Sequence, residues 1–172
     1  MAADGRAPYD IASEPHDHAA CVDEALARAE ALCERRSVRL TPVRRQVLEL
    51  VWRSHRPRGA YDILDDLASD GRRPAPLTVY RALDFLVAQG FAHRLESLNA
   101  FVGCVHPGER HPTQFLVCSD CGAATELHDP QVAEAIDRSA ADRGFTIEQP
   151  MVEIKGLCPL CRDKTGRDRN GN

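Results

Sequence analysis

Apolar side chains recur at helical spacing in four successive segments of the first ninety residues. The first predicted helix runs from about Cys21 to Arg36, and the second opens at Thr41-Pro42, with threonine as the N-cap and proline in the first turn. The third is predicted over 61–68 and the fourth over 77–89. Each carries an apolar stripe on one side. The pattern therefore predicts a small helical domain.

The fourth predicted helix has the clearest pattern. Its core stripe is expected to comprise Val79, Leu83, Leu86 and Val87, and Gly90 suits the left-handed position at a helix end. Tyr80, Arg81 and Asp84 fall off this stripe and are expected to face solvent.

Two short strands follow the fourth helix, over 91–96 and 100–105, joined at Ser97-Leu98-Asn99. Helices followed by a hairpin predict a winged helix-turn-helix domain, in which the fourth helix enters the major groove of DNA.

The pattern changes after about residue 105. Strands are predicted over 114–118 and 123–127, a helix from Asp129-Pro130 to Gly144, and a longer strand over 146–155 that is interrupted by Pro150. Such a small unit has open sheet edges and a thin core, which pairing with a second copy would cover. The expected fold class is therefore α+β: a winged-helix domain followed by a small α/β dimerisation domain. The predicted boundaries are an arm over 1–20, a DNA-binding domain over 21–105, a dimerisation and metal-binding domain over 106–161, and a polar tail over 162–172.

Two Cys-x-x-Cys motifs bracket this second domain. They are Cys118-Ser-Asp-Cys121 and Cys158-Pro-Leu-Cys161. Four thiolates at that spacing predict a closed, tetrahedral, structural zinc site. The alternatives are two disulfides or a redox pair. No signal peptide is visible, so we expect a cytoplasmic protein with reduced thiols, and zinc is the favoured interpretation.

A second metal site is predicted from the hairpin. If its loop comprises only Leu98 and Asn99, His93 lies directly across from Cys104, with the two side chains on one face. His111 follows on a Pro/Gly-containing loop, and Glu126 lies on a strand beyond the first Cys-x-x-Cys motif. A site of His93, Cys104, His111 and Glu126 would favour zinc over iron, manganese or magnesium because it includes a thiolate. A closed site of this kind indicates sensing rather than catalysis.

Charge is distributed unevenly along the chain. The net charge is -4, yet residues 21–96 hold thirteen arginines against eleven acidic residues. This positive segment is consistent with a DNA-binding surface, because arginine suits phosphates and guanine edges. No apolar run approaches the roughly 18 residues of a membrane span, so no membrane partner is expected.

With these residues in place, the chain resembles the ferric uptake regulator superfamily, and within it the zinc uptake regulator branch. The resemblance covers about residues 22–161. It is carried by Arg39-Leu-Thr-Pro-Val-Arg, Ala60-Tyr-Asp-Ile-Leu, Thr78-Val-Tyr-Arg-Ala-Leu-Asp-Phe-Leu, Gln89-Gly-Phe-Ala-His-Arg-Leu-Glu-Ser, Phe115-Leu-Val-Cys-Ser-Asp-Cys-Gly and Gly156-Leu-Cys-Pro-Leu-Cys.

The resemblance implies a homodimeric repressor that binds palindromic, A/T-rich operators of zinc-uptake genes when loaded with two Zn²⁺ per subunit. It implies a structural zinc at Cys118, Cys121, Cys158 and Cys161, and a regulatory zinc at His93, Cys104, His111 and Glu126. DNA contacts are expected from Tyr80 and Arg81, and we add Thr78 and Arg44 to the expected DNA-contacting residues. No small-molecule substrate is implied.

Several alternatives stay open. His106 competes with His111 as the third regulatory ligand, His128 offers a further site, and the N-terminal arm carries His16 and His18. A zinc hydrolase or deaminase would need Glu126 as a general base rather than a ligand, together with an open coordination position. A structural zinc module would leave Tyr80, Arg81 and the second site unexplained. The chain is therefore expected not to be an enzyme.

Overall fold

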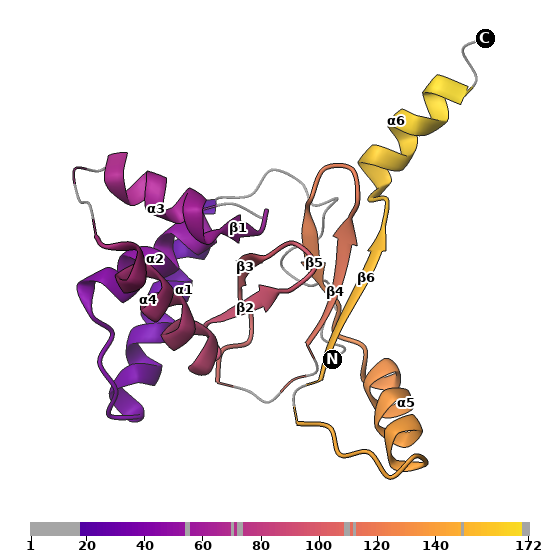
Figure 1. The fold of residues 1–172 in the computed structure, drawn as a ribbon, viewed down its shortest axis with the longest axis horizontal. Coiled ribbons are helices and arrows are strands. Elements are labelled where there is room, and N and C mark those ends of the chain that lie inside the picture. Colours follow the sequence, from indigo (N-terminus) through magenta and orange to yellow (C-terminus); the bar gives the residue numbers. More distant parts are fainter. Residues whose placement is uncertain are drawn as a thin grey trace. The chain divides into compact units, whose positions relative to one another are not determined.

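The computed structural model of the chain describes residues 18–53, 56–69, 71, 74–108, 111, 113–148 and 150–169. They divide into an N-terminal unit that ends at residue 109 and a C-terminal unit that begins at residue 110 (Figure 1). The predicted arm lies largely outside the described residues, His16 included, although the first helix already begins at His18. No helix in the described ranges is long and apolar enough to cross a membrane.

The N-terminal unit is built from four helices and a small sheet. The helices are α1 (His18–Arg35), α2 (Pro42–Trp52), α3 (Ala60–Ser69) and α4 (Pro76–Ala88). The strands are β1 (Arg58–Gly59), β2 (Ala92–Leu95) and β3 (Ala100–Gly103), in the order β1-β3-β2. All four predicted helices are confirmed, and so is the hairpin that forms the wing.

Local signals place the helix ends as predicted. Thr41 caps α2 by accepting a hydrogen bond from the Arg44 N–H, and Pro42 occupies its first turn. Gly90 has φ +71° and ends α4, while the Phe91 N–H donates to Leu86 O at 2.8 Å. The stripe prediction for α4 was nearly right, since Val79, Leu83 and Leu86 are buried. Val87, however, is 37% exposed, and the smaller Ala82 is buried instead.

The predicted hairpin register is wrong by two residues. His93 pairs with Val102, not with Cys104, because four residues separate Leu95 from Ala100. The backbone reverses with Asn99 at φ +48°. Because side chains alternate faces with a period of two, a slip of two residues leaves His93 and Cys104 on one face.

The C-terminal unit is a three-stranded sheet with two helices. Its elements are β4 (Thr113–Cys118), β5 (Ala124–Glu126), α5 (Pro130–Ala141), β6 (Met151–Gly156) and α6 (Pro159–Arg169). β5 pairs antiparallel to β4, and β6 lies parallel to β4 on its other side. The predicted long strand over 146–155 is shortened, because β6 begins only after Pro150. The predicted polar tail is largely helical in α6.

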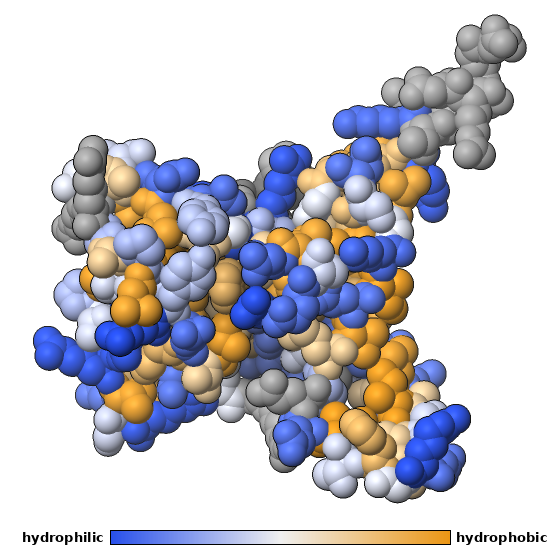
Figure 2. All heavy atoms as spheres, viewed as in Figure 1, coloured by the Kyte–Doolittle hydropathy of each residue, from blue (hydrophilic) through white to orange (hydrophobic). Residues whose placement is uncertain are grey.

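The C-terminal unit buries little of its own apolar surface. No residue of α5 is buried, so Val132 and Ile136, predicted to face inward, are only partly covered. Ile154 of β6 is 45% exposed, and Phe145, after α5, is 69% exposed. Figure 2 shows hydrophobic side chains gathered along β6 and α5.

Candidate metal centres and DNA-binding helix

Four cysteines of the C-terminal unit gather into one cluster. Their Sγ atoms all lie within 4.8 Å of one another: Cys118, Cys121, Cys158 and Cys161. Cys118 ends β4, and a tight turn with Gly122 at φ +70° brings Cys121 back toward it. Cys158 directly precedes α6 and Cys161 lies in its first turn, so this spacing of three residues brings their side chains to the same side.

The spacing of the sulfur atoms fits zinc and excludes disulfides. The Cys121 and Cys158 Sγ atoms are 3.9 Å apart, and none of the seven cysteines forms a disulfide. A disulfide requires about 2.05 Å. Tetrahedral zinc with Zn–S bonds of about 2.3 Å places its sulfur ligands about 3.8 Å apart. The disulfide alternative is therefore wrong, and the donor set suits a closed Zn²⁺ site.

Hydrogen bonds prepare Cys118 to act as a thiolate. The Cys158 N–H donates to Cys118 Sγ at 3.4 Å. This bond, with further backbone N–H groups from Cys121 and Asp120, lowers the pKa of Cys118 to about 6, against the raising effect of burial. The pKa of Cys161 is instead raised, chiefly by its hydrogen bond with Asp120 and then by burial. A bound cation would replace that proton.

The N-terminal unit holds the first half of the predicted regulatory site. The ligand atoms of His93 on β2 and Cys104, just beyond β3, lie within 4.8 Å of each other. The Cys104 N–H donates to Phe91 O at 3.0 Å, which closes the base of the hairpin beside the thiol. Cys104 is 1% exposed. The two donors are thus diagonal neighbours across the hairpin rather than directly opposed.

The C-terminal unit holds the second half. His111 Nε2 lies 2.9 Å from Glu126 Oε1, and both side chains are buried. Glu126 is carried by β5, and its backbone register is set by pairing with Phe115 of β4. His111 and His106 were the two candidates for the third ligand, and His111 is the one that lies beside the Glu126 carboxylate. Among the described residues, neither His106 nor His128 belongs to a group of three or more potential metal ligands.

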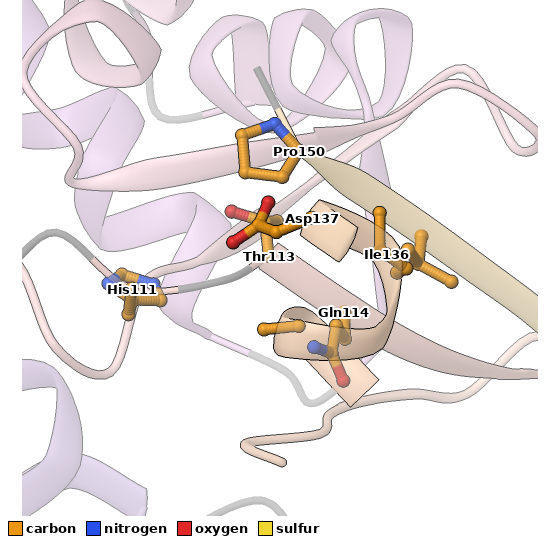
Figure 3. Close-up of a pocket in the computed structure, with 8 residues that line it drawn as sticks. His111, Thr113, Gln114, Ile136, Asp137 and Pro150 are labelled. Carbon is orange, nitrogen blue, oxygen red and sulfur yellow. The ribbon is translucent and has the colours of Figure 1, made fainter. Parts of the chain in front are cut away.

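His111 also lines a hollow within the C-terminal unit, between β4, α5 and the start of β6. Its volume is about 210 Å³, and its lining residues include Thr113, Gln114, Ile136 and Pro150. In Figure 3 the imidazole lies at one side of this hollow, across from Ile136. The hollow was not anticipated from the sequence.

Residues predicted to contact DNA lie on or near α4. Thr78 and Arg81 are exposed, and Tyr80 is 38% exposed. Partial burial, and then the charge and hydrogen bond of Tyr61, raise the pKa of Tyr80. Sequence reasoning missed Tyr61, which is 73% exposed on α3 beside Tyr80.

Arg44 has a different setting. Its guanidinium lies 3.5 Å from the centroid of the Phe85 ring, and Nη1 donates to Arg39 O at 2.6 Å. Arg44 is therefore stacked between α2 and α4, and it is half-buried rather than projecting.

Comparisons with known proteins agree on one family. The model of the ferric uptake regulator family matches residues 35–155. The zinc uptake regulation protein of Escherichia coli strain K12 is 41% identical over 139 residues, which cover 80% of this chain and 81% of that protein. A zinc uptake regulation protein of Mycobacterium tuberculosis H37Rv is 29% identical over 105 residues, covering 61% of this chain and 80% of that protein.

Solved structures give the same result. A zinc uptake regulator complexed with zinc and DNA has a TM-score of 0.80 and 39% identity, covering 84% of this chain and 97% of that one. The structure of holo XcZur has a TM-score of 0.75 and 42% identity, covering 82% of this chain and 99% of that one. The α+β class is thereby confirmed, and membership of a family of regulators also confirms that the chain is not an enzyme. The chain belongs to the ferric uptake regulator family, in the branch of the zinc uptake regulation proteins.

Proposed function

We propose that this chain is a zinc-responsive, homodimeric transcriptional repressor that binds palindromic, A/T-rich operators of zinc-uptake genes when zinc-loaded. The observation that carries the proposal is a complete four-thiolate cluster in a chain whose wing also bears the His93–Cys104 pair. The first is suited to hold metal permanently, and the second is suited to sense it.

The four-cysteine cluster would hold the structural zinc. Cys118 and Cys121 lie at one end of the C-terminal unit's sequence, and Cys158 and Cys161 lie at the other. A metal held by all four sulfurs would tie the two ends of the unit's sequence together next to the paired ends of β4 and β6. In a unit whose helix α5 buries no residue, such bonds supply folding free energy that apolar packing does not.

The regulatory zinc would be shared between the two units. His93 and Cys104 supply two donors from the wing, and His111 and Glu126 supply two from the C-terminal unit. A Zn²⁺ held by these four residues would join the two pairs, and a site closed by four protein ligands suits sensing rather than catalysis. The thiolate favours zinc over iron(II), manganese or magnesium.

These four residues would then work as a hinge lock. In a dimer, the angle between the units sets the spacing of the two α4 helices, which must match major-groove faces about 34 Å apart or a multiple of it. Fixing the angle before DNA binds removes an ordering cost from the binding step. A coupling free energy of about 2–3 kcal/mol would change operator affinity roughly 30- to 150-fold.

Helix α4 would read the operator. Arg81 has the fork geometry that pairs with the O6 and N7 acceptors of guanine. Tyr80 offers a ring edge and a hydroxyl, and its hydrogen-bonded neighbour Tyr61 would lie on the same surface. Thr78 would contact a phosphate near the start of α4, where helical N–H groups favour anions. Arg44, stacked on Phe85, would add positive potential.

The C-terminal unit would form the dimer interface. β6 is an edge strand of its sheet, and its Met151 and Ile154 are exposed, as is Leu116 of β4. A second copy would cover this apolar surface and pair the open edge. Because a repressor acts on chromosomal DNA, the proposed location is the cytoplasm.

Titration of operator binding against buffered free zinc tests the proposal. The full-length protein should retard an A/T-rich palindromic duplex only above a threshold of free Zn²⁺. A scrambled duplex should not be bound, and iron(II) or manganese(II) at the same free concentration should have little effect. Equal affinity with and without zinc would refute the regulatory function.

A further inference from the structure

Helix α1 and the residue directly after it hold both ends of the wing. Just before β2, Arg36 Nη1 donates to Gln89 O at 2.7 Å. Just after β3, Arg28 Nη1 donates to Val105 O at 3.0 Å. Arg28 lies on α1, and Arg36 is the residue that directly follows its last residue, Arg35. The stretch between the two carbonyls contains both wing donors, and α1 therefore fixes the base of the hairpin that presents them.

The contact at Val105 is adjacent to Cys104. On one side of Cys104, its own N–H donates to Phe91 O at 3.0 Å. On the other side, the carbonyl of the following residue, Val105, accepts from the Arg28 guanidinium. The peptide group before Cys104 is thus tied to Phe91, next to β2, and the carbonyl one residue beyond Cys104 is tied to α1. Together these two bonds restrain the backbone from which the Cys104 side chain projects.

The segment after Cys104 also packs on α1. A Cβ added to Gly108 would fall 2.8 Å from Leu32 Cδ2, so the backbone there lies directly against α1. Gly108 has φ +91°, a conformation that L side chains rarely adopt. Leu32 itself is buried. The contacts of α1 thus extend from the base of the wing to the end of the N-terminal unit.

We propose that Arg28 is a positioning residue for the regulatory metal: it orders the backbone next to Cys104 so that the thiolate faces His93 before metal arrives. A charged guanidinium N–H donating to a carbonyl is a strong hydrogen bond with defined direction. Without it, residues 105–108 gain freedom that metal binding must remove again. The proposal deepens the function proposed above and rests on it for the identity of the site.

Arg28 also makes an ion pair with Glu24 one turn away. The effect of losing this ion pair has to be distinguished from the effect of losing the hydrogen bond to Val105 O. Both side chains are substantially exposed, so the pair itself contributes little. Glu24→Gln removes the ion pair and leaves the bond to Val105. Arg45→Gln removes a comparable exposed ion pair, Arg45–Glu30, between α2 and α1 and touches neither end of the wing.

The test compares Arg28→Gln with both controls in the full-length protein. The affinity of the second, weaker zinc is measured by competition with a zinc chelator. The readout is the fluorescence emission of Trp52, the chain's single tryptophan. Arg28→Gln should weaken this zinc roughly tenfold, as expected for loss of one charged hydrogen bond. Zinc in the four-cysteine cluster should remain. Glu24→Gln and Arg45→Gln should match the wild type.

A purely structural role would lower the unfolding temperature of Arg28→Gln without moving its zinc affinity, and that result would overturn the proposal. If Arg28→Gln does not fold, Arg28→Lys decides, because lysine keeps one donor for the carbonyl. The affinity of Arg28→Lys for the second zinc should then lie below that of the wild type, by less than tenfold. Wild-type affinity together with a lowered unfolding temperature would again overturn the proposal. A wild-type protein that binds two zinc ions but ignores them on DNA would instead refute the proposed function, leaving the Arg28 comparison intact.

Discussion

The indole of Trp52 lies directly against the backbone of Gly103. A Cβ on Gly103 would fall 2.3 Å from Trp52 Cε2 and Nε1, a distance that real Cβ atoms do not reach. Trp52 is 7% exposed at the end of α2, so its ring has little room to withdraw. The residue after Gly103 is Cys104. The residue that packs against the core of the N-terminal unit is therefore the direct neighbour of the wing cysteine.

Gly103→Ala should consequently disturb both stability and zinc response. Overpacking of this kind typically costs about 1–3 kcal/mol of unfolding free energy. Displacement of β3 should also move Cys104 relative to His93 and weaken the second zinc. Chemical denaturation and zinc competition measure the two effects. Gly156→Ala is the matched control, because a Cβ there meets no atom within 4 Å; equal stability of both variants would contradict the packing argument.

Cys104→Ser should give a folded protein with a filled four-cysteine cluster that no longer responds to zinc. A serine hydroxyl is a far poorer zinc ligand than a thiolate at neutral pH, so affinity at this site should fall by orders of magnitude. Zinc added to the wild type should change the emission of Trp52, and this change should vanish in the variant. Normal zinc-dependent operator binding by Cys104→Ser would show that the thiol is only a small buried residue.

The wing illustrates why some of this geometry could be predicted and some could not. The face shared by His93 and Cys104 follows from the two-residue period of a strand and survives a register error of two. The register itself depends on the turn. Here Glu96–Asn99 contains no Asn-Gly or Asp-Gly pair to select a two-residue loop, and the four-residue turn was not foreseen.

Contacts that depend on tertiary packing left no signal in the sequence. The two-residue strand β1, between the second and third helices, was not predicted, because its pairing with β3 is a tertiary contact that local propensity does not indicate. Nothing local indicates that Trp52 covers Gly103 or that Arg44 stacks on Phe85. The Cys-x-x-Cys motifs were informative because a zinc site constrains residue type and spacing together.

Loss of one thiolate from the four-cysteine cluster should unfold or dissociate the protein. A closed four-thiolate zinc site contributes folding free energy on the order of 10 kcal/mol. Cys118→Ser or Cys158→Ser, or prolonged treatment with a strong chelator, should therefore give unfolded or monomeric material. Sedimentation and zinc analysis of the purified protein decide this. Cys21→Ser, on α1 and outside both metal clusters, is the control and should remain dimeric with full zinc content.

Arg81→Ala should weaken operator binding while leaving both zinc ions and the dimer in place. The side chain is exposed on α4 and packs no core, so its removal should not affect folding. A bidentate contact to guanine is worth about 1–3 kcal/mol of base discrimination, so specificity should relax at one base pair of each half-site. Tyr80→Ala should also reduce affinity, by removing an apolar or phosphate contact.

Binding is measured by fluorescence anisotropy on the operator and on single-base variants. Arg138→Ala, which removes the same charge from the exposed face of α5, serves as the control for net charge. If Arg81→Ala loses affinity equally on every duplex, Arg81 contacts phosphate only; if it loses none, another helix enters the groove.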